Sequence, residues 1–598
     1  MTTALLDKDA IKKKYAEERA KRIREDGNEQ YQRLESNFED MATDPHTPFQ
    51  ERSPVQDHVT FAFVGAGFSG LVVGARLREA GISDFRLIEK GGNVGGTWYW
   101  NRYPGAQCDT AAMIYLPLLE ETGHMPSEKY VHGPEIRGHC ERIANQYALY
   151  DKALFHTEVK AIEWQEDASV WRITTNRGDD FTAKYVGIGT GPLHVAKLPG
   201  IEGVKDFKGK SFHTSRWDYA YTGGDPEGAP LDKLADKRVA ITGTGATAVQ
   251  CVPHLARSAG ELFVFQRTPS SVDERNNHKI DPDWFAETAT PGWQQRWLDN
   301  FVENQGRGMP KEDLVDDGWT EISRRIREKL LSMPKEDWGP QAMLAAFEDA
   351  DFEKMEQIRA RVDAVVQDDE TAQGLKAWYN QLCKRPCFHD DYLAAFNNPN
   401  AHLVHTDGKG VERITETGVV ANGQLYEVDC IIYASGFEVG TDYTSRAGFD
   451  LKGREAKRLS EHWSDGMRTL HGMHVHGFPN AFIVQPNQAA NMISNVPHNI
   501  LDHAKTIAHI ISHAEAEGAV SVEPTQEAEQ AWVELILSGE GTMLGSTECT
   551  PGYYNNEGKG WSQEFRQAQG HPGGPAGFFS HIDKWREAGD FKGLRFSK

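Results

Sequence analysis

Short apolar runs alternate with longer amphipathic segments along most of the chain. Val59–Val64 has the pattern of a buried strand, Leu71–Ala80 that of a helix, and Phe85–Glu89 that of a second strand. Strand, helix and strand in this order are typical of a parallel βαβ unit. The hydrophobic pattern therefore predicts an α/β domain that begins near residue 58.

The same order of elements returns further along the chain. Residues 237–242 are predicted to form a strand, 249–256 a helix and 262–266 a second strand. Further strands are predicted at 429–436 and at 480–484. The second βαβ unit is far enough from the first for each to begin a domain of its own.

Two regions depart from this alternation. The segment from about 276 to 382 is rich in Trp, Glu, Arg and Ala and has few β-branched runs, which predicts a helical insertion. Near the N-terminus, Ile11, Tyr15 and Ile23 recur in steps of four within a charged stretch, which indicates an amphipathic helix. We expect residues 1–57 to form a charged helical extension, with a Pro-containing linker at 44–54.

A glycine-rich turn joins strand to helix in both units. The first turn reads Gly65-Ala66-Gly67-Phe68-Ser69-Gly70, and the second reads Gly243-Thr244-Gly245-Ala246-Thr247-Ala248. Glycine permits the tight turn, the close approach of a pyrophosphate and the close packing of helix on strand, while the helix N-terminus attracts the anion. One such turn is weak evidence, but two between a strand and a helix are much stronger.

The predicted fold class is therefore α/β, with two Rossmann-like dinucleotide-binding domains, a helical insertion and an N-terminal helical extension. We expect residues 58–198 and 436–598 to form the first domain, and 199–435 to form the second, which contains the insertion.

Residues of opposite charge close the second strand of the two units. Glu89 lies nineteen residues after Gly70, and Arg267 lies nineteen residues after Ala248. A carboxylate accepts hydrogen bonds from a free ribose 2′-hydroxyl, whereas an arginine pairs with a 2′-phosphate. We therefore expect FAD (or NAD) at the first turn and NADPH at the second, where Thr268 adds a hydroxyl donor. The alternative for Arg267 is a solvated charge at a strand end.

The composition narrows the partners. The 598 residues include 65 Lys and Arg against 88 Asp and Glu, a net charge of −23, which disfavours binding to nucleic acid or to an anionic membrane. No apolar run is long enough to span a bilayer, and the N-terminus resembles neither a secretory signal nor a transit peptide. Seven scattered cysteines are not a disulfide framework, so we expect a reducing compartment, the cytoplasm. The oligomeric state stays open between a monomer and a small homo-oligomer.

Two other groups of residues have side chains that could carry chemistry. A disulfide reductase needs a Cys-x-x-Cys pair beside the flavin, and the sequence has none. Cys383 and Cys387 have three residues between them, so we expect two buried or partly buried thiols. His471, His474 and His476 lie before a predicted strand without a Cys or carboxylate set to complete a metal site, so no metal is expected.

Two further segments resemble the signatures of one enzyme family. Gly95–Asp109 resembles the long signature of the Baeyer–Villiger monooxygenases, and Phe207–Trp217 matches their short signature, Phe-x-Gly-x-x-x-His-x-x-x-Trp. Together with the flanking turns, the resemblance covers about residues 58–598. It implies an FAD- and NADPH-dependent enzyme that takes a ketone and O₂ as substrates. Such an enzyme inserts one oxygen atom beside the carbonyl through a flavin C4a-peroxide and a Criegee-type intermediate, giving an ester or lactone.

The resemblance also implies roles for particular residues. Arg385, in a Lys-Arg-Pro stretch, would be the catalytic arginine, Asp109 would lie near the flavin and hold it, and Lys384 would be a further 2′-phosphate ligand. A guanidinium does not lose its proton in proteins, so it can stabilise a peroxide anion without quenching it. The remaining signature residues divide into a set at the flavin, Gly96, Thr97, Trp98 and Tyr103, and a set that couples the domains, Phe207, Gly209, His213 and Trp217.

One position departs from the family pattern. Many members carry a Trp-Tyr pair near the C-terminal end, and here Gly552 stands where that Trp would fall. This feature and the charged N-terminal extension resemble the branch that acts on large-ring ketones such as cyclododecanone and cyclopentadecanone. Two alternatives stay open: a flavin monooxygenase that hydroxylates nitrogen or sulfur, and a nucleotide-responsive binding protein whose extension recruits a partner.

Overall fold

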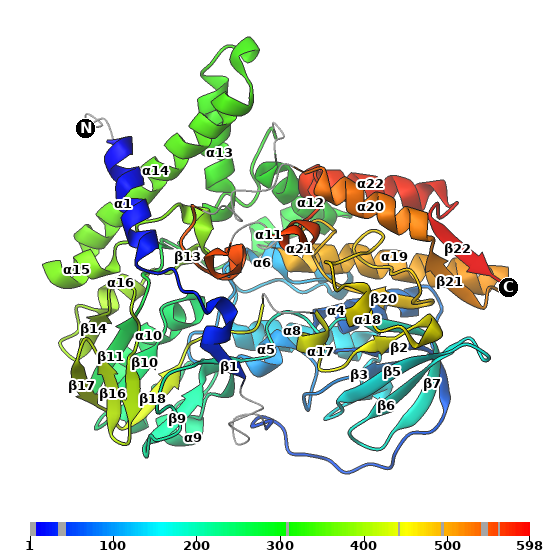
Figure 1. Ribbon diagram of the computed structural model, residues 1–598, viewed down its shortest axis with the longest axis horizontal. Helices are drawn as coiled ribbons and strands as arrows, with labels where there is room; N and C mark the ends of the chain where they lie inside the picture. The colour runs from blue at the N-terminus through cyan, green and yellow to red at the C-terminus, as the bar shows by residue number, and fades with distance from the viewer. Residues whose placement is uncertain are drawn as a thin grey trace.

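The structure is a computed structural model that describes residues 7–33, 43–306, 310–439, 443–491, 495–539, 548–559 and 562–598. A larger mixed sheet and a smaller parallel sheet lie side by side, and helices from the middle and the end of the chain cover them (Figure 1). The larger sheet lies to the right in this view and the smaller to the left. Their facing strand ends position the candidate site.

The larger sheet contains the first βαβ unit. Its strand order is β19-β5-β6-β7-β2-β3-β4, and β20 also pairs with β7. The strands are β2 (His58–Val64), β3 (Phe85–Ile88), β4 (Ala153–Leu154), β5 (Val159–Gln165), β6 (Val170–Thr175), β7 (Asp180–Ile188), β19 (Leu451–Lys452) and β20 (Ala481–Ile483). β2 is parallel to both neighbours, β3 and β7. A central strand with both faces covered explains why its sequence is almost continuously apolar.

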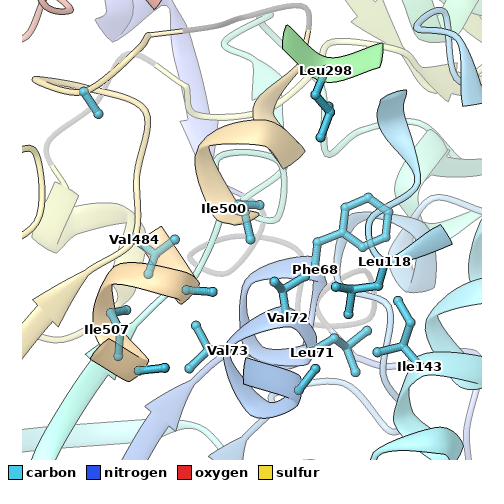
Figure 2. Packing of buried hydrophobic residues seen from close by; sticks show 14 of the residues in the cluster. Phe68, Leu71, Val72, Val73, Leu118, Ile143, Leu298, Val484, Ile500 and Ile507 are labelled. Atoms are coloured by element: carbon cyan, nitrogen blue, oxygen red, sulfur yellow. The ribbon is translucent and has the colours of Figure 1, made fainter. Parts of the chain in front are cut away.

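Helix α4 (Phe68–Glu79) follows β2 and is buried along most of its length. It begins three residues before the predicted helix. It packs against α19 (Val496–Glu517), a helix more than 400 residues later in the chain. Figure 2 shows Leu71 near Leu118 and Ile143, and Val73 on the side that faces Ile507. The C-terminal part of the chain therefore completes the core around the first turn.

The smaller sheet contains the second βαβ unit. Its order is β14-β11-β10-β18-β9, and every pair in it is parallel. The strands are β9 (Lys210–His213), β10 (Arg238–Thr242), β11 (Glu261–Gln266), β14 (Ala401–His405) and β18 (Cys430–Tyr433). Helix α10 (Ala246–Ser258) follows the second turn. The two Rossmann-like units expected from the sequence are confirmed, and they form separate sheets.

The helical insertion is also confirmed. It contains α11 (Pro282–Thr288), α12 (Trp293–Gln305), α13 (Gly318–Leu331), α14 (Pro340–Val365) and α15 (Asp369–Leu375). Helices α13 and α14 extend away from the sheets at the top of Figure 1. The Asp317 side chain accepts a hydrogen bond from Trp319 N, which caps α13 at its start and holds Trp319 on its first turn.

The N-terminal extension is helical, and it packs on the insertion. In α1 (Lys8–Ala20), Ile11 and Tyr15 are buried against Phe352 of α14. The expectation for Ile23 was wrong, because the helix ends before it and the side chain is 47% exposed. Further along, β1 (Tyr31–Arg33) pairs antiparallel with β8 (Lys197–Pro199), so the extension is joined to the main body by backbone hydrogen bonds.

The remaining elements are short or lie at the periphery. They are α5 (Thr97–Trp100), α6 (Ala112–Tyr115), α7 (Leu119–Thr122), α8 (Gly133–Gln146), α9 (Tyr219–Thr222), α16 (Tyr392–Ala395), α17 (Tyr443–Ala447), α18 (Leu459–His462), α20 (Gln526–Leu537), α21 (Gln563–Gln567), α22 (Gly574–Ala588), β12 (Val272–Asp273), β13 (Cys387–Phe388), β15 (Arg413–Thr415), β16 (Gly418–Ala421), β17 (Gln424–Glu427), β21 (Ser521–Pro524) and β22 (Leu594–Ser597). No helix in the described part of the chain has the length and apolar character needed to cross a membrane.

One prediction about the cysteines was wrong. Cys383 forms a disulfide with Cys549, whereas Cys387 is a buried free thiol as expected. The two partners lie 166 residues apart in sequence, so no local spacing reveals the pair. The argument from scattered cysteines to a reducing compartment does not hold for this pair, and the cytoplasm stays a prediction.

Candidate active site between the two glycine-rich turns

One continuous cavity of about 1590 Å³ connects the two turns. Its walls include Gly65 and Gly67 of the first turn, Gly243 and Gly245 of the second, and the pair Asp109 and Arg385. A concave site of this kind, at the carboxyl ends of parallel strands, is where α/β proteins bind ligands. Most of the predicted site residues thus line a shared space, although they come from distant parts of the sequence.

The first turn requires glycine on steric grounds. Gly65 has φ +107°, and a Cβ on Gly70 would lie 2.0 Å from the Gly65 carbonyl oxygen. Gly67 immediately precedes helix α4, and a Cβ there would lie 3.2 Å from the Cα atom of Gly96 in the long signature. The two glycine-rich segments therefore pack backbone to backbone beside the N-terminus of α4, where the first amide groups of the helix are available to an anion.

Glu89 lies just after β3 and is held by the same turn. Its carboxylate accepts hydrogen bonds from Ala66 N and Gly91 N, each at 2.7 Å. The residue is 6% exposed. Burial raises the pKa of its carboxyl group, although the two hydrogen bonds act to lower it. A carboxylate has about four acceptor sites, so Glu89 keeps capacity for a ligand hydroxyl in the cavity that it lines.

The second turn has a similar backbone but leaves more open space. Gly243 has φ +104°, and a Cβ there would lie 2.5 Å from the Ala434 carbonyl oxygen. A Cβ on Gly245, directly before helix α10, would meet no other protein atom within 4 Å. The Thr244 hydroxyl donates to the Thr268 carbonyl at 2.7 Å, which ties the turn to the end of β11. This open backbone at a helix N-terminus fits a pyrophosphate.

Basic side chains gather beside the second turn. Arg267 and Lys384 both line the cavity, together with Thr268. Arg267 Nη1 donates to Gln30 Oε1 at 2.5 Å, and Lys384 Nζ donates to the Pro551 carbonyl at 3.2 Å. Burial lowers the pKa of the Lys384 ammonium to about 8, and the Arg267 cation contributes to this lowering. The charges of this pocket favour an anionic group.

Arg385 and Asp109 form a two-pronged ion pair. Arg385 Nη2 lies 2.6 Å from Asp109 Oδ1, and Arg385 Nε lies 3.1 Å from Asp109 Oδ2. Trp319 supports both partners: its Nε1 donates to the Asp109 carbonyl at 2.8 Å, and the guanidinium carbon lies 5.0 Å from its ring centroid. Burial acts to lower the pKa of Arg385, but the nearby Asp109 and Tyr554 outweigh it and hold the pKa well above its usual value. The group is therefore a cation at any working pH.

The long signature reaches from the first turn to the second. Trp98 and Tyr103, like Thr97 and Gly96, line the cavity. Trp98 Nε1 donates to the Tyr115 hydroxyl at 3.0 Å, whereas the Tyr103 hydroxyl donates at 3.0 Å to Gln250 of helix α10. The same segment thus contacts both halves of the site.

The four defining residues of the short signature, Phe207, Gly209, His213 and Trp217, do not line the cavity, although Arg216 of the same segment does. His213 is fully buried, and burial lowers its pKa to about 3, so it is neutral and accepts a hydrogen bond from Ser215 N at 3.2 Å. A Cβ on Gly209 would lie 2.5 Å from the Phe207 ring, which explains the glycine. Trp217 Nε1 donates to Thr222 at 3.0 Å. These contacts give the segment a fixed shape.

Contact between the two signatures comes from the residues next to His213 and Trp217. The Arg216 guanidinium carbon lies 4.1 Å from the Trp100 ring centroid, and the Tyr219 hydroxyl donates to the Arg102 carbonyl at 2.5 Å. Arg216 of the short signature and Tyr219 just after it therefore contact the long signature.

Several cavity residues had no signal in the sequence. Lys197 comes from the strand that pairs with the N-terminal extension. Trp319, which supports Asp109 and Arg385 from outside the cavity lining, comes from the helical insertion. Tyr553 and Tyr554 follow Gly552, and this aromatic doublet was the one hint available. Arg24, Gln30 and Tyr31 of the extension also line the cavity. None of these positions belongs to a recurring motif.

The histidines at 471 and 474 are buried in an aromatic cluster. The ring centroid of His471 lies 4.7 Å from that of Trp532, and burial lowers the pKa of His474 to about 3. Across the described ranges, no group of three or more His, Cys, Asp or Glu residues is arranged to hold a metal ion.

The comparisons with known proteins cover the whole chain. A family described as pyridine nucleotide-disulphide oxidoreductase matches residues 62–289, which contain both turns. Neopentalenolactone D synthase of Streptomyces avermitilis is 50% identical over 99% of each chain. A Baeyer-Villiger monooxygenase of Streptomyces coelicolor is 46% identical over 96% of this chain and 95% of its own.

The chain belongs to the Baeyer–Villiger monooxygenase family.

A solved structure agrees with this membership. The polycyclic ketone monooxygenase of the fungus Thermothelomyces thermophila has a TM-score of 0.91 at 36% identity, and 99% of each chain is covered. As a member of this family, the protein described here is an oxidoreductase that uses FAD and NADPH and converts ketones to esters or lactones. Residues 62–289 contain no Cys-x-x-Cys pair, so the family match reflects the nucleotide-binding fold.

Proposed function

We propose that this enzyme oxidises bulky cyclic ketones, with fused or large rings, and that Arg385 and Asp109 are central to the reaction. The observation that carries the proposal is the two-pronged ion pair between Arg385 and the buried Asp109, in a cavity lined by both glycine-rich turns. A fixed cation between two nucleotide sites is suited to a reaction in which negative charge develops on oxygen.

In this proposal Arg385 stabilises that charge. Bound FAD supplies the activation of oxygen, and NADPH supplies the reducing equivalents. The guanidinium donates hydrogen bonds to the developing oxyanion and keeps its own proton, because its pKa is raised. Asp109 is a positioning residue that holds the Arg385 fork in one orientation, and the Trp319 ring lies beside the guanidinium.

We propose the first turn as the FAD site and the second as the NADPH site. Glu89 would accept hydrogen bonds from a ribose of FAD, and the backbone at Gly67 would approach its pyrophosphate. Arg267, Lys384 and Thr268 would hold the 2′-phosphate of NADPH. The open space in front of Gly245 and the cations beside it support this assignment.

The domain division follows the same assignment. We propose that residues 58–198 and 436–598 form the FAD domain and that residues 199–435 form the NADP domain. All strands of the larger sheet come from the first two ranges, and all strands of the smaller sheet come from the third. The contacts of Arg216 and Tyr219 with the long signature support a coupling role for the short signature.

The substrate class rests on space beside the site. A Cβ on Gly552 would lie 3.3 Å from Lys384 Nζ and would meet no other protein atom within 4 Å, so the Trp that many relatives carry would extend into open space here. Glycine leaves that volume to ligands. The name of the fungal structure, a polycyclic ketone monooxygenase, agrees with a large substrate.

The test is product analysis with a panel of ketones, from a small monocyclic ring to fused and large rings. The purified protein should carry flavin, consume NADPH in a ketone-dependent way and form esters or lactones, most rapidly from the bulky members. Oxygenation of sulfides or amines with no ester from any ketone would contradict the proposal and favour the hydroxylating alternative.

Arg385→Ala separates binding from chemistry. Removal of one such donor typically costs about 10²–10³ in rate, so ester formation should fall by that amount. NADPH should still bleach the flavin absorbance in the absence of oxygen, because that step uses other contacts. Ester formation at a near wild-type rate would overturn the role of Arg385. Arg361→Ala is a matched control, because this arginine bonds backbone carbonyls outside the cavity lining.

A further inference from the structure

The N-terminal extension reaches the end of β11, where the proposed 2′-phosphate ligands lie. Arg22 Nε donates to the Thr268 hydroxyl at 3.2 Å, and Gln30 Oε1 accepts from Arg267. Arg22 is 5% exposed, so its guanidinium lies inside the protein next to the second site. Two residues of the extension thus contact two of the residues expected to bind NADPH.

Four cations converge at this place. Arg22, Arg267 and Lys197 all depress the pKa of Lys384, beyond the effect of its burial. Among the described residues, Arg267, Lys197 and Lys384 have no carboxylate oxygen within 4.0 Å. Like charges brought together away from water are costly unless an anion joins them.

Two carboxylates offset this charge only in part. Glu557 opposes the lowering of the Lys384 pKa, and Glu18 pairs with Arg22 at 2.7 Å. Glu18 is shared with Lys14 and Lys21, each at 2.9 Å, so it does not neutralise Arg22 alone. Burial would raise the pKa of Glu18, but the hydrogen bonds from these three cations hold it at about 2. The cluster keeps a net positive charge at neutral pH.

The extension is anchored on both sides of Arg22. Before it, Tyr15 packs against Phe352 of α14, and Arg19 Nε donates to the Cys549 carbonyl at 3.3 Å. After it, Asn28 donates to Asn556 at 3.2 Å, and the Tyr31 strand pairs with β8. These contacts fix the position of Arg22 without any ligand, as a preformed binding site requires.

We propose that Arg22 is a further binding and specificity-determining residue for the 2′-phosphate of NADPH, supplied to the second site by the N-terminal extension. The proposal rests on the assignment of that site to NADPH. Arg22 Nε bonds Thr268 and Nη1 bonds Glu18, which leaves the N–H groups of Nη2 to bond a phosphate next to Arg267 and Lys384. The extension then acts as one wall of the nucleotide site.

The test measures binding rather than turnover. Calorimetric titration of the FAD-loaded, full-length enzyme with adenosine 2′,5′-bisphosphate reports the phosphate end of the ligand alone, and adenosine 5′-monophosphate lacks the 2′-phosphate. Arg22→Gln keeps a polar side chain that can donate hydrogen bonds, but it is shorter and removes the charge. It should weaken the bisphosphate by about tenfold and leave the monophosphate unchanged. Equal bisphosphate affinity in wild type and variant would overturn the proposal.

Matched variants exclude a merely structural effect. Lys13 is exposed on α1, which ends just before Arg22, so Lys13→Ala changes the charge of the extension equally and should leave both affinities unchanged. Glu18→Gln removes the carboxylate that competes for Arg22, so it should tighten the bisphosphate. If Arg22→Gln weakens both ligands equally, or Glu18→Gln weakens the bisphosphate, Arg22 acts by holding the helix and the proposal fails.

Arg267→Ala distinguishes the two levels of the argument. If Arg267→Ala weakens the bisphosphate and Arg22→Gln does not, the NADPH site stands and the role of Arg22 falls. If neither variant discriminates between the two ligands, the assignment of the second turn itself is wrong.

A measurement on the unmodified enzyme completes the test. Trypsin cleaves after Lys21, Arg22 and Arg24, and we expect the bisphosphate to slow these cleavages while the monophosphate does not. Equal cleavage rates with both ligands would count against the proposal.

Discussion

The two glycine-rich turns have almost the same backbone and very different surroundings. Gly65 and Gly243 have φ +107° and +104°, and each turn passes into a helix directly after its second glycine. The residues that follow the next strand in the two units, Glu89 and Arg267, differ in where their hydrogen-bond partners lie. Glu89 is bonded by the backbone of its own turn, whereas Arg267 is bonded by Gln30, 237 residues earlier.

This difference indicates how each site is built. The acceptor at the first turn is supplied and oriented by one βαβ unit, so it forms when that unit folds. The cations at the second turn come from the extension, the β8 strand, β11 and the segment before β13, so that site exists only once these parts have docked. We expect the first site to hold its cofactor throughout turnover and the second to exchange its nucleotide, because contacts made by docked segments open at lower cost.

The largest difference should come from one substitution made in both turns. Gly67→Val would press on Gly96, whereas Gly245→Val would project into open space. We expect the first variant to purify without flavin and without activity, and the second to keep its flavin and lose affinity for NADPH. The visible flavin absorbance and a titration with NADP⁺ check this. Full flavin occupancy in Gly67→Val would show that the first turn has been misassigned.

The next effect concerns cofactor choice. Arg267→Ala removes a charged hydrogen bond, worth about 1.5–3 kcal/mol, so the KM for NADPH should rise about tenfold to a hundredfold. The KM for NADH should stay nearly constant. Steady-state kinetics with both cofactors give the answer, and parallel losses would show that Arg267 does not read the 2′-phosphate. Flavin content should not change, in contrast to Gly67→Val.

A smaller effect should appear with pH at the second site only. Burial lowers the pKa of Lys384 to about 8 in the free enzyme, and a bound phosphate should raise it. Affinity for NADP⁺ is then full below pH 8 and falls as the pH rises through 8, because the free enzyme loses the proton that the complex retains. We expect about tenfold weaker binding at pH 9 than at pH 7.

Two controls apply to that titration. The 2′-phosphate carries its full charge above about pH 7, so it does not contribute to the change. Lys384→Arg keeps a positive charge at both pH values and should flatten the profile, and NAD⁺ should show no such dependence. A profile of equal slope in Lys384→Arg would assign the proton to another group.

The smallest effect should follow loss of the disulfide. Cys383 and Cys549 connect the Lys384–Arg385 segment to the stretch that carries Gly552 and the two tyrosines. Cys549→Ser should lower the thermal midpoint of unfolding and weaken NADP⁺ by less than Arg267→Ala does, with flavin content unchanged. A reducing agent should change the wild type in the same direction and leave the variant unaffected. A reductant effect of equal size in the variant would assign the change to another thiol.

The sequence located much of the site for identifiable reasons. Glu89 and Arg267 were predicted because a βαβ unit has a fixed length, so the residue expected to read the ribose lies at a constant offset from the turn, and both residues line the cavity. Arg385 and Asp109, 276 residues apart, were linked only through the family resemblance, and the structure brings them within hydrogen-bonding distance.

Other expectations failed where tertiary contacts decided the outcome. Ile23 has the spacing of a helical residue, but α1 ends at Ala20 and leaves it exposed. Cys383 was expected to be a free thiol, because a pairing with a cysteine 166 residues away has no local signal. Local spacing cannot report which distant segments meet, since that depends on how the sheets and helices dock.

The amino-acid sequence by itself determined the two βαβ units, their glycine-rich turns and the opposite charges that follow them. These features depend on contacts within about thirty residues, so short-range sterics and hydrogen bonding specify them. Tertiary structure alone decided that Trp319 contacts Arg385, that Cys383 pairs with Cys549, and that the extension places Arg22 beside Arg267 and Thr268. Each of these contacts joins segments far apart in the chain, and only the packing of the complete core brings them together.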